Sequence, residues 1–148
     1  MTIYCGADHG GYQLKEILKL WLQQQNYSVE DCGATQLDPK DDYPDFAFAV
    51  AKKVVQNPES IGILLCRSGG GMVIAANRIK GIRAVNIHDE KGAVHAKTNN
   101  NANIVSLEAD WLGDEQAKQV LSAFLKAKFA GEERHVRRIG KIGRYLDN

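Results

Sequence analysis

A cysteine and a serine stand just before a run of glycines, directly after the most apolar segment of the chain, residues 61–65. Glycines allow backbone N–H groups to converge on an anion at the start of a helix, where the helix dipole also favours a thiolate. Such a cysteine can act as a general base, and the serine can donate a hydrogen bond to a developing enediolate oxygen. The alternative is an inert cysteine buried at a tight turn. The motif consists of Cys66, Arg67, Ser68, Gly69, Gly70 and Gly71.

Asp8 and His9 follow the first apolar segment in the same way, and Gly10 and Gly11 come next. A carboxylate and an imidazole beside flexible glycines can contact a polar ligand. Equally, Asp8 can cap a helix and His9 can lie on the surface. Neither glycine motif is a nucleotide site of the common kinds, because the G-x-G-x-x-G pattern and the P-loop lysine are both absent.

Further polar residues occur near position 100 and in the C-terminal tail. Asn99 and Asn100 can bind sugar hydroxyls as donors and acceptors, or can simply form a turn. Arg134 and Arg138 are four residues apart, so on a helix they share one face and can bind phosphate. The tail can also be a solvated face, a helix that reaches a partner subunit, or a weak nucleic-acid patch.

The composition is that of an ordinary protein domain. The 148 residues include 44% hydrophobic and 25% charged residues, with a net charge of +1. We therefore expect one domain over residues 1–148 and no affinity for nucleic acid or membranes. Three cysteines without C-x-x-C spacing predict neither a disulfide framework nor a zinc site, and they suit the cytoplasm. The first residues enter a strand pattern directly, and no apolar run reaches about 18 residues, so we expect no signal peptide and no membrane span.

Short apolar segments alternate with amphipathic ones, which predicts an α/β fold with a parallel sheet covered on both faces. The expected strands are 3–7, 28–31, 61–65, 82–85 and 103–106. The expected helices cover 12–25, a segment from Phe46 to about Val55, a short one ending near Arg78, 89–97 with Asp89 as its N-cap, and one capped by Asp114. Ligands bind at the carboxyl ends of such strands. We expect the loops 8–11, 66–71 and 97–103 to meet there.

Together these segments resemble the ribose-5-phosphate isomerase B and galactose-6-phosphate isomerase family. Each motif is short, but the motifs follow one another in order over nearly the whole chain. The matching residues are Ala7-Asp8-His9-Gly10-Gly11-Tyr12 with Leu14-Lys15, Asp42-Tyr43-Pro44, Gly62-Ile63 with Cys66, Ile74-Ala75-Ala76-Asn77, Gly81-Ile82-Arg83-Ala84, Asn100 with Ala102-Asn103, and Arg134-His135 with Arg138.

The resemblance implies a Rossmann-like three-layer α/β/α sandwich with a five-stranded parallel sheet. It implies a homodimer or tetramer with active sites at the subunit interface, the helical tail 132–148 packing on the partner. The implied activity is a metal-free and cofactor-free exchange of aldose and ketose phosphates in carbohydrate metabolism, specifically the pentose phosphate pathway. Predicted catalytic residues are Cys66, Ser68, Asp8 and Asn99. Predicted substrate- and phosphate-binding residues are His9, Tyr43, Arg67, Gly69, Gly70, Gly71, Asn100, Arg134 and Arg138.

By the same resemblance, the Cys66 thiol moves a proton between C1 and C2 of the sugar. Ser68 and the amides of 69–71 hold the enediolate, and Asp8 lies near the ring oxygen. His9 and the arginines Arg134 and Arg138 hold phosphate, the arginines coming from the neighbouring subunit.

Three positions depart from the family pattern. Arg67 replaces a glycine, and it can either lower the pKa of the neighbouring thiol or obstruct the anion site. Asn99 replaces a histidine associated with opening the sugar ring, and asparagine cannot carry a proton. Asp110 falls where the family has a phosphate-contacting arginine, and a carboxylate there would repel phosphate.

These departures leave three hypotheses. The favoured one is an active sugar-phosphate isomerase with altered specificity, for which Arg67 supplies the charge lost at Asp110 and an open-chain four-carbon sugar needs no ring opening. The alternative is a catalytically impaired sugar-phosphate-binding or regulatory subunit. The third is a nucleic-acid-binding module that uses the basic tail.

Overall fold

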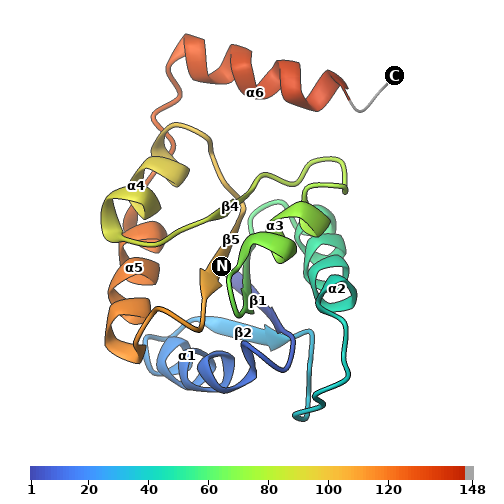
Figure 1. The fold of residues 1–148 in the computed structure, drawn as a ribbon. Coiled ribbons are helices and arrows are strands. Elements are labelled where there is room, and N and C mark those ends of the chain that lie inside the picture. Colours follow the sequence, from blue (N-terminus) through green and yellow to red (C-terminus); the bar gives the residue numbers. More distant parts are fainter. Residues whose placement is uncertain (146–148) are drawn as a thin grey trace.

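The computed structural model describes residues 1–145 and contains one five-stranded sheet (Figure 1). The strands run parallel in the order β2-β1-β3-β5-β4, which confirms the predicted sheet. The order places β3 at the centre, where both of its faces are covered. The strands are β1 (Thr2–Ala7), β2 (Ser28–Asp31), β3 (Ile61–Cys66), β4 (Ala84–Asn86) and β5 (Ile104–Glu108).

Helices cover both faces of the sheet and form a three-layer sandwich. Helices α1, α4 and α5 lie on one face, and α2 and α3 lie on the other (Figure 1). Helix α6 extends away from this body at the end of the chain. No helix among residues 1–145 is long and apolar enough to cross a membrane. The helices are α1 (Tyr12–Gln24), α2 (Tyr43–Gln56), α3 (Gly70–Ala76), α4 (Glu90–Thr98), α5 (Asp114–Lys126) and α6 (Glu133–Tyr145).

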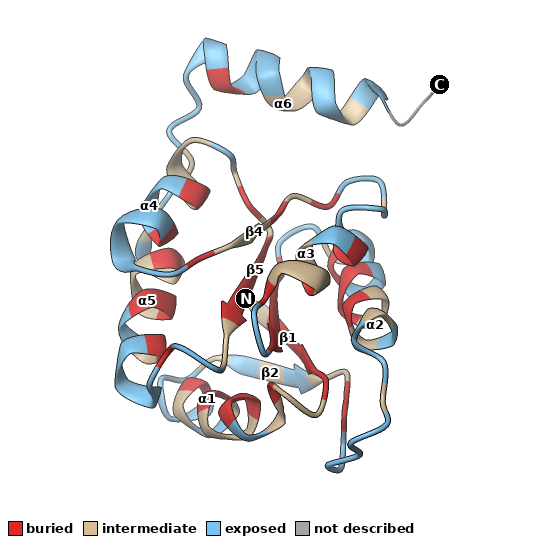
Figure 2. Cartoon of the chain, in the orientation of Figure 1, coloured by how far each residue is buried: buried red, intermediate tan, exposed pale blue. Residues whose placement is uncertain are grey.

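Strand β3 is buried over its whole length because it carries apolar side chains toward both layers. Figure 2 shows that buried residues are concentrated in the sheet and on the helix faces that cover it. Ile63 and Leu65 face the layer of α1, α4 and α5, whereas Leu64 and Cys66 face α2 and α3. Since side chains alternate between the two faces of a strand, the same parity applies along each neighbour. This alternation fixes which residues can meet at the end of the sheet.

A buried lysine fastens β2 and the loop after it to α1. The Lys15 side chain is fully buried, and its Nζ lies 2.8 Å from Asp31 Oδ1 and also donates to the carbonyl of Ala34. Lys19, one turn further along α1, donates to the other oxygen of Asp31. A buried cation needs such partners to offset the loss of its hydration.

Several predicted boundaries were wrong. Strand β4 begins at Ala84 rather than residue 82, because Ile82 still belongs to a turn in which its amide donates to Ile79. Helix α2 begins at Tyr43, three residues early, because proline fits the first turn of a helix. Gly113 rather than Asp114 is the N-cap of α5. The prediction for Asp89 is confirmed, since its Oδ1 accepts the Gly92 amide at 2.6 Å.

The predicted C-terminal helix is confirmed as α6. Residues 146–148 of the predicted tail lie outside the described residues. His135 is the buried residue of α6, while most of its arginines are exposed. The helix therefore joins the body near its start, and further along it one face lines a cavity above the body while the other faces solvent.

Candidate functional site at the carboxyl edge of the sheet

Cys66 ends the central strand and turns into the glycine-rich start of α3. Its Sγ accepts the Gly69 amide at 3.0 Å, and 5% of the residue remains exposed. Gly69 has a φ of +76°, which a side chain would make costly. The exposed Ser68 stands at the top of this turn. The thiol and the Gly69 amide therefore meet at this turn, beside an exposed serine.

The pKa of the Cys66 thiol is raised from its ordinary value, which corrects the expectation that the helix start favours its thiolate. Burial is the largest cause, and the charge of Asp8 adds to it. The amides of Gly69, Ser68 and Met72 act in the opposite direction. Desolvation outweighs these amides, so the resting thiol is protonated at neutral pH.

Tyr43 packs against the same turn from the start of α2. A Cβ on Gly71 would lie 2.7 Å from the tyrosine Cζ, so the ring occupies the space that glycine leaves. The ring is partly exposed, at 40%. Tyr43 therefore lies against the start of α3, although it comes from the far end of the loop 32–42, and its predicted contact with substrate stays a prediction.

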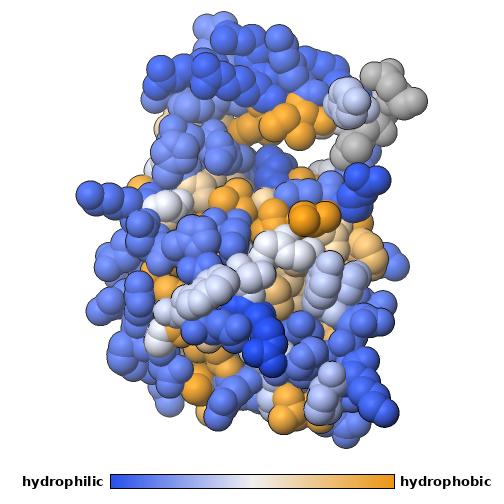
Figure 3. Space-filling view, viewed as in Figure 1, coloured by the Kyte–Doolittle hydropathy of each residue, from blue (hydrophilic) through white to orange (hydrophobic). Residues whose placement is uncertain are grey.

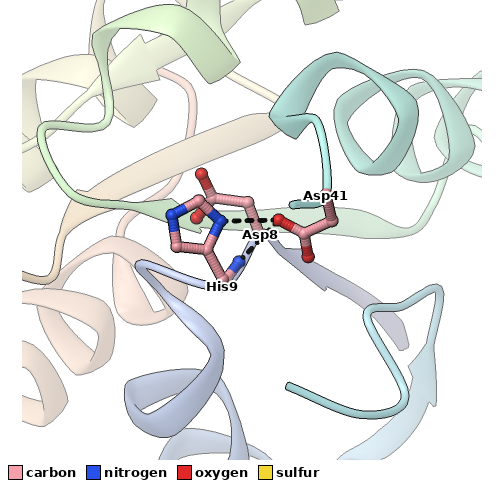
Figure 4. Close-up of side chains that lie close together, drawn as sticks. All are labelled: Asp8, His9 and Asp41. Atoms are coloured by element: carbon pink, nitrogen blue, oxygen red, sulfur yellow. Dashed lines mark hydrogen bonds and ion pairs between the residues drawn. The ribbon is translucent and has the colours of Figure 1, made fainter. Parts of the chain in front are cut away.

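Asp8 and His9 lie at the end of β1, the neighbour of β3, and Figure 4 shows them beside Asp41. Asp41 Oδ1 accepts the His9 amide at 3.0 Å and lies 2.7 Å from His9 Nδ1. Asp8 Oδ1 accepts the Gly11 amide at 3.1 Å, so it also fixes the turn into α1. Burial raises the pKa of Asp8, although that amide and His9 lower it.

The pair of Asp41 and His9 rules out the interpretation of His9 as a free surface histidine. Donor atoms of Asp8, His9 and Asp41 lie within 4.8 Å of one another. Asp41 Oδ2 is buried and has no hydrogen-bond partner among the described residues. Nothing in the sequence marked Asp41, because it lies 32 positions from His9 in a loop of several aspartates.

Arg67 neither enters the turn nor stands alone. Its side chain is 65% exposed, and its guanidinium lies 3.6 Å from the carboxylate of Asp110. Its stem lies over the turn after β1, since a Cβ on Gly10 would be 2.6 Å from Arg67 Cγ. Two of the three departures from the family pattern therefore pair with each other at the rim of the site.

The loop 97–103 does not join this edge, which corrects the sequence prediction. All five strands are parallel, and this loop precedes β5, so Asn99 and Asn100 lie at the amino edge of the sheet. The carbonyl of Asn103 accepts the amide of Gly62 near the start of β3. Glu108 is the fifth and last residue of β5, so it lies roughly 16 Å along the strand from the end of this loop.

Arg138 shares a cavity with these asparagines beneath α6. The cavity has a volume of about 480 Å³, and helix α6 forms one of its walls. Arg134 lies one turn earlier, 2.9 Å from Glu132. The predicted residues therefore fall into two groups within one chain, one at each edge of the sheet. The lining of the cavity includes Asn77, Arg83, His95, Asn99, Asn100, His135, Arg138, Ile139 and Ile142.

Two further residues, to which the sequence prediction gave no role, complete the carboxyl edge. Glu108 pairs with Cys66 in the register of β5 and β3, and its carboxylate lies 2.8 Å from Nδ1 of His88. Asn86 donates to the carbonyl of Ser68 at 3.0 Å. In the sequence, both residues come at the end of an apolar segment. This position indicates a place in the site only once the strand order is known.

The comparisons with known proteins point to one family. A family model described as ribose/galactose isomerase matches residues 3–142. A probable ribose-5-phosphate isomerase B of Mycoplasma pneumoniae is 43% identical, covering 97% of this chain and 93% of that protein. A D-erythrulose-4-phosphate isomerase of Pectobacterium atrosepticum is 37% identical, covering 98% and 95%.

Solved structures agree equally well. Ribose-5-phosphate isomerase B from Mycoplasma genitalium, with bound ribulose-5-phosphate, has a TM-score of 0.95 at 41% identity, covering 99% of this chain and 97% of that chain. Because the order of the motifs, the sheet and the near full-length similarity all agree, the chain belongs to the ribose/galactose isomerase family.

Proposed function

We propose that this protein interconverts an aldose phosphate and a ketose phosphate through an enediolate, with Cys66 as the base that moves a proton between C1 and C2. The observation that carries the proposal is the Cys66 thiol at the end of the central strand, facing the Gly69 amide. A thiol beside convergent N–H groups can exchange a proton while the amides hold the developing oxyanion. The relative with bound ribulose-5-phosphate supports a sugar phosphate as the ligand.

The raised pKa of Cys66 sets how the reaction starts. The thiolate is the minor form at neutral pH, so turnover begins from that fraction. Ser68 is exposed on the same turn and can donate to the substrate oxygen. Asp8, buried beside the thiol, lies where it can contact the sugar near its ring oxygen.

The proposed site is completed by a second copy of the chain. Asn99, Asn100, Arg134 and Arg138 lie away from the Cys66 edge of their own subunit, so they can reach a Cys66 only in another subunit. Helix α6 exposes apolar side chains beside the cavity, including Ile142 at 62%, and Figure 3 shows the hydrophobic patch beneath it. Ile74 of α3 is 71% exposed, directly after the Cys66 turn. We propose a homodimer in which α3 of one copy packs under α6 of the other.

This dimer gives each phosphate group a cationic site built from two subunits. Arg134 and Arg138 of one copy would face His9 of the other, and guanidinium groups bind phosphate through paired hydrogen bonds. The Arg67 guanidinium offsets the negative charge of Asp110 at the rim, which reduces the repulsion of an incoming phosphate. The paired departures are thus compatible with a phosphorylated substrate.

The test is turnover of a panel of tetrose, pentose and hexose phosphates, because relatives named for both four- and five-carbon sugars match this chain. We expect one member of the panel to be isomerised by the wild-type protein. Cys66→Ser removes the proposed base and is expected to abolish turnover. Cys32→Ser changes a half-buried cysteine that follows β2 and is expected to retain turnover. Equal activity of the two variants would refute Cys66 as the base.

A further inference from the structure

His88 and Glu108 form a side-chain pair directly beside the Cys66 turn that the proposed mechanism has not used. Glu108 Oε2 lies 2.8 Å from His88 Nδ1, within hydrogen-bond distance. The Glu108 side chain is 12% exposed, whereas the His88 side chain is 61% exposed. A nearly buried carboxylate therefore holds one nitrogen of an accessible imidazole. The other nitrogen, Nε2, can exchange a proton with a ligand.

The sheet register places this pair in line with the catalytic groups. Ala7 pairs with Leu65, Cys66 pairs with Glu108, and Asn86 pairs with Ser106. Cys66 and Glu108 are the last residues of their strands, Asp8 is one residue past β1 and His88 is two residues past β4, so all four lie level with one another in a row at the carboxyl edge. In spatial order from β1 to β4 the row is Asp8, Cys66, Glu108 and His88.

All four side chains of the row point to the same face of the sheet. Cys66 belongs to the cluster packed under α2 and α3. Ser106, two residues before Glu108, donates to the carbonyl of Gly69 at 3.0 Å, and Asn86, two residues before His88, donates to Ser68. Since side chains repeat every second residue, Glu108 and His88 follow on this face, just beyond the Cys66 turn.

We propose that His88 is a catalytic acid–base of the isomerase, and that Glu108 is the residue that positions it. This inference rests on the proposed function of Cys66. Neighbouring strands are about 4.8 Å apart, so the Cα atoms of Cys66 and His88 are roughly 10 Å apart, which leaves room for the reacting end of a sugar between the two side chains. Cys66 transfers the proton between the carbon atoms C1 and C2, and His88 transfers protons to and from the oxygens on these carbons.

The step balances without any added reactant. In the aldose-to-ketose direction the Cys66 thiolate takes the proton from C2, and that electron pair forms the C1–C2 double bond. The His88 ring starts in its protonated form, and the former carbonyl oxygen on C1 takes a proton from its Nε2. The neutral Nε2 then takes the proton from the hydroxyl on C2, whose oxygen becomes the new carbonyl, and the Cys66 thiol returns its proton to C1. Both side chains end as they began.

Glu108 contributes by fixing the imidazole. A carboxylate that accepts from Nδ1 selects the tautomer and stabilises the protonated ring. Asn99, which lies at the opposite edge of its own sheet, cannot carry a proton in any case. The His88 pair therefore supplies this chain with a proton carrier at the edge where Cys66 lies.

The experiment measures kcat and KM of four variants, on whichever sugar phosphate the wild-type protein turns over. We expect His88→Ala to lower kcat by about 10²- to 10⁴-fold with little change in KM, and added imidazole to restore part of it. We expect Glu108→Gln to lower kcat by about 10- to 100-fold. His88→Gln repeats the loss without rescue, because its side chain fills the space that imidazole would enter.

Glu115→Gln is the matched control. It removes the ion pair of Glu115 with Lys118 on α5 and is expected to leave kcat unchanged. Thermal unfolding checks that each variant is folded. If His88→Ala keeps kcat within about twofold, or loses it without rescue by imidazole, the proposed role is refuted. If the wild-type protein turns over none of the sugar phosphates, the proposed function itself has failed, which is a separate outcome.

Discussion

Mixing two inactive variants gives a quantitative test of the shared active site. Cys66→Ala removes the proposed base from the carboxyl edge, and Arg138→Ala removes a proposed phosphate ligand beneath α6. If each site combines the Cys66 of one subunit with the Arg138 of the other, a mixed dimer has one intact site and one doubly defective site. Activity should therefore return when two nearly inactive proteins are combined.

The magnitude follows from the two-fold symmetry of such a dimer. Random exchange of equal amounts makes half of the dimers mixed, and each mixed dimer has one working site of two. The expected recovery is about a quarter of the wild-type activity. The assay is sugar-phosphate turnover after the variants are unfolded together and refolded, with light scattering to confirm dimers.

A second mixture is the control. Cys66→Ala and Ser68→Ala both alter the same turn, so every site of their mixed dimers keeps one defect, and no recovery is expected. Recovery in this control, or its absence in the first mixture, would refute the division of the site between subunits. A site contained within one chain predicts no recovery in either mixture.

Three further predictions concern the scaffold that positions the site. Lys15→Ala leaves Asp31 half-buried without its main partner and should lower the free energy of unfolding by about 3 kcal/mol in urea titrations; an unchanged midpoint would show that the buried cation is dispensable. Gly11→Ala places a Cβ 2.4 Å from the Leu65 carbonyl carbon and should cost about 3 kcal/mol. Gly113→Ala, at the same N-cap position of α5 but with open space, should cost only about 0.5 to 1 kcal/mol, and equal costs would contradict the crowding at Gly11. Burial raises the pKa of Cys5 from 9.0 to about 12, so between these pH values the unfolded chain loses a proton that the folded chain keeps. The free energy of unfolding then falls by up to about 1.4 kcal/mol per pH unit. Cys5→Ala should remove this part of the dependence of stability on pH, and the same dependence in both proteins would contradict the assignment.

The sheet and the Cys66 turn could be predicted because their signals are local. A buried central strand needs a continuous apolar run, as in 61–66, and a helix that starts at a strand end needs glycines when backbone and side chains crowd it, as Tyr43 crowds Gly71. Hydrophobic periodicity located the helices for the same reason. The errors at β4 and at the start of α2 concern single turns, where hydrogen bonds rather than burial set the boundary.

The composition of the site could be predicted only in part, because it depends on strand order and chain direction. The asparagines near 100 look like neighbours of the Cys66 loop until β5 is known to run away from them. The partnerships of His9 with Asp41, Arg67 with Asp110 and His88 with Glu108 join residues distant in sequence. No spacing rule in one sequence predicts such pairs.

Solvent-deuterium exchange at C2, followed by NMR, tests the central claim most directly, because it detects proton abstraction even when net conversion is slow. With the wild-type protein, deuterium should enter C2 of at least one phosphate in a panel of tetrose, pentose and hexose phosphates. With folded Cys66→Ala, the same position should keep its hydrogen. Exchange at the wild-type rate in that variant, or no exchange with the wild-type protein on any member of the panel, would contradict Cys66 as the base of a sugar-phosphate isomerase.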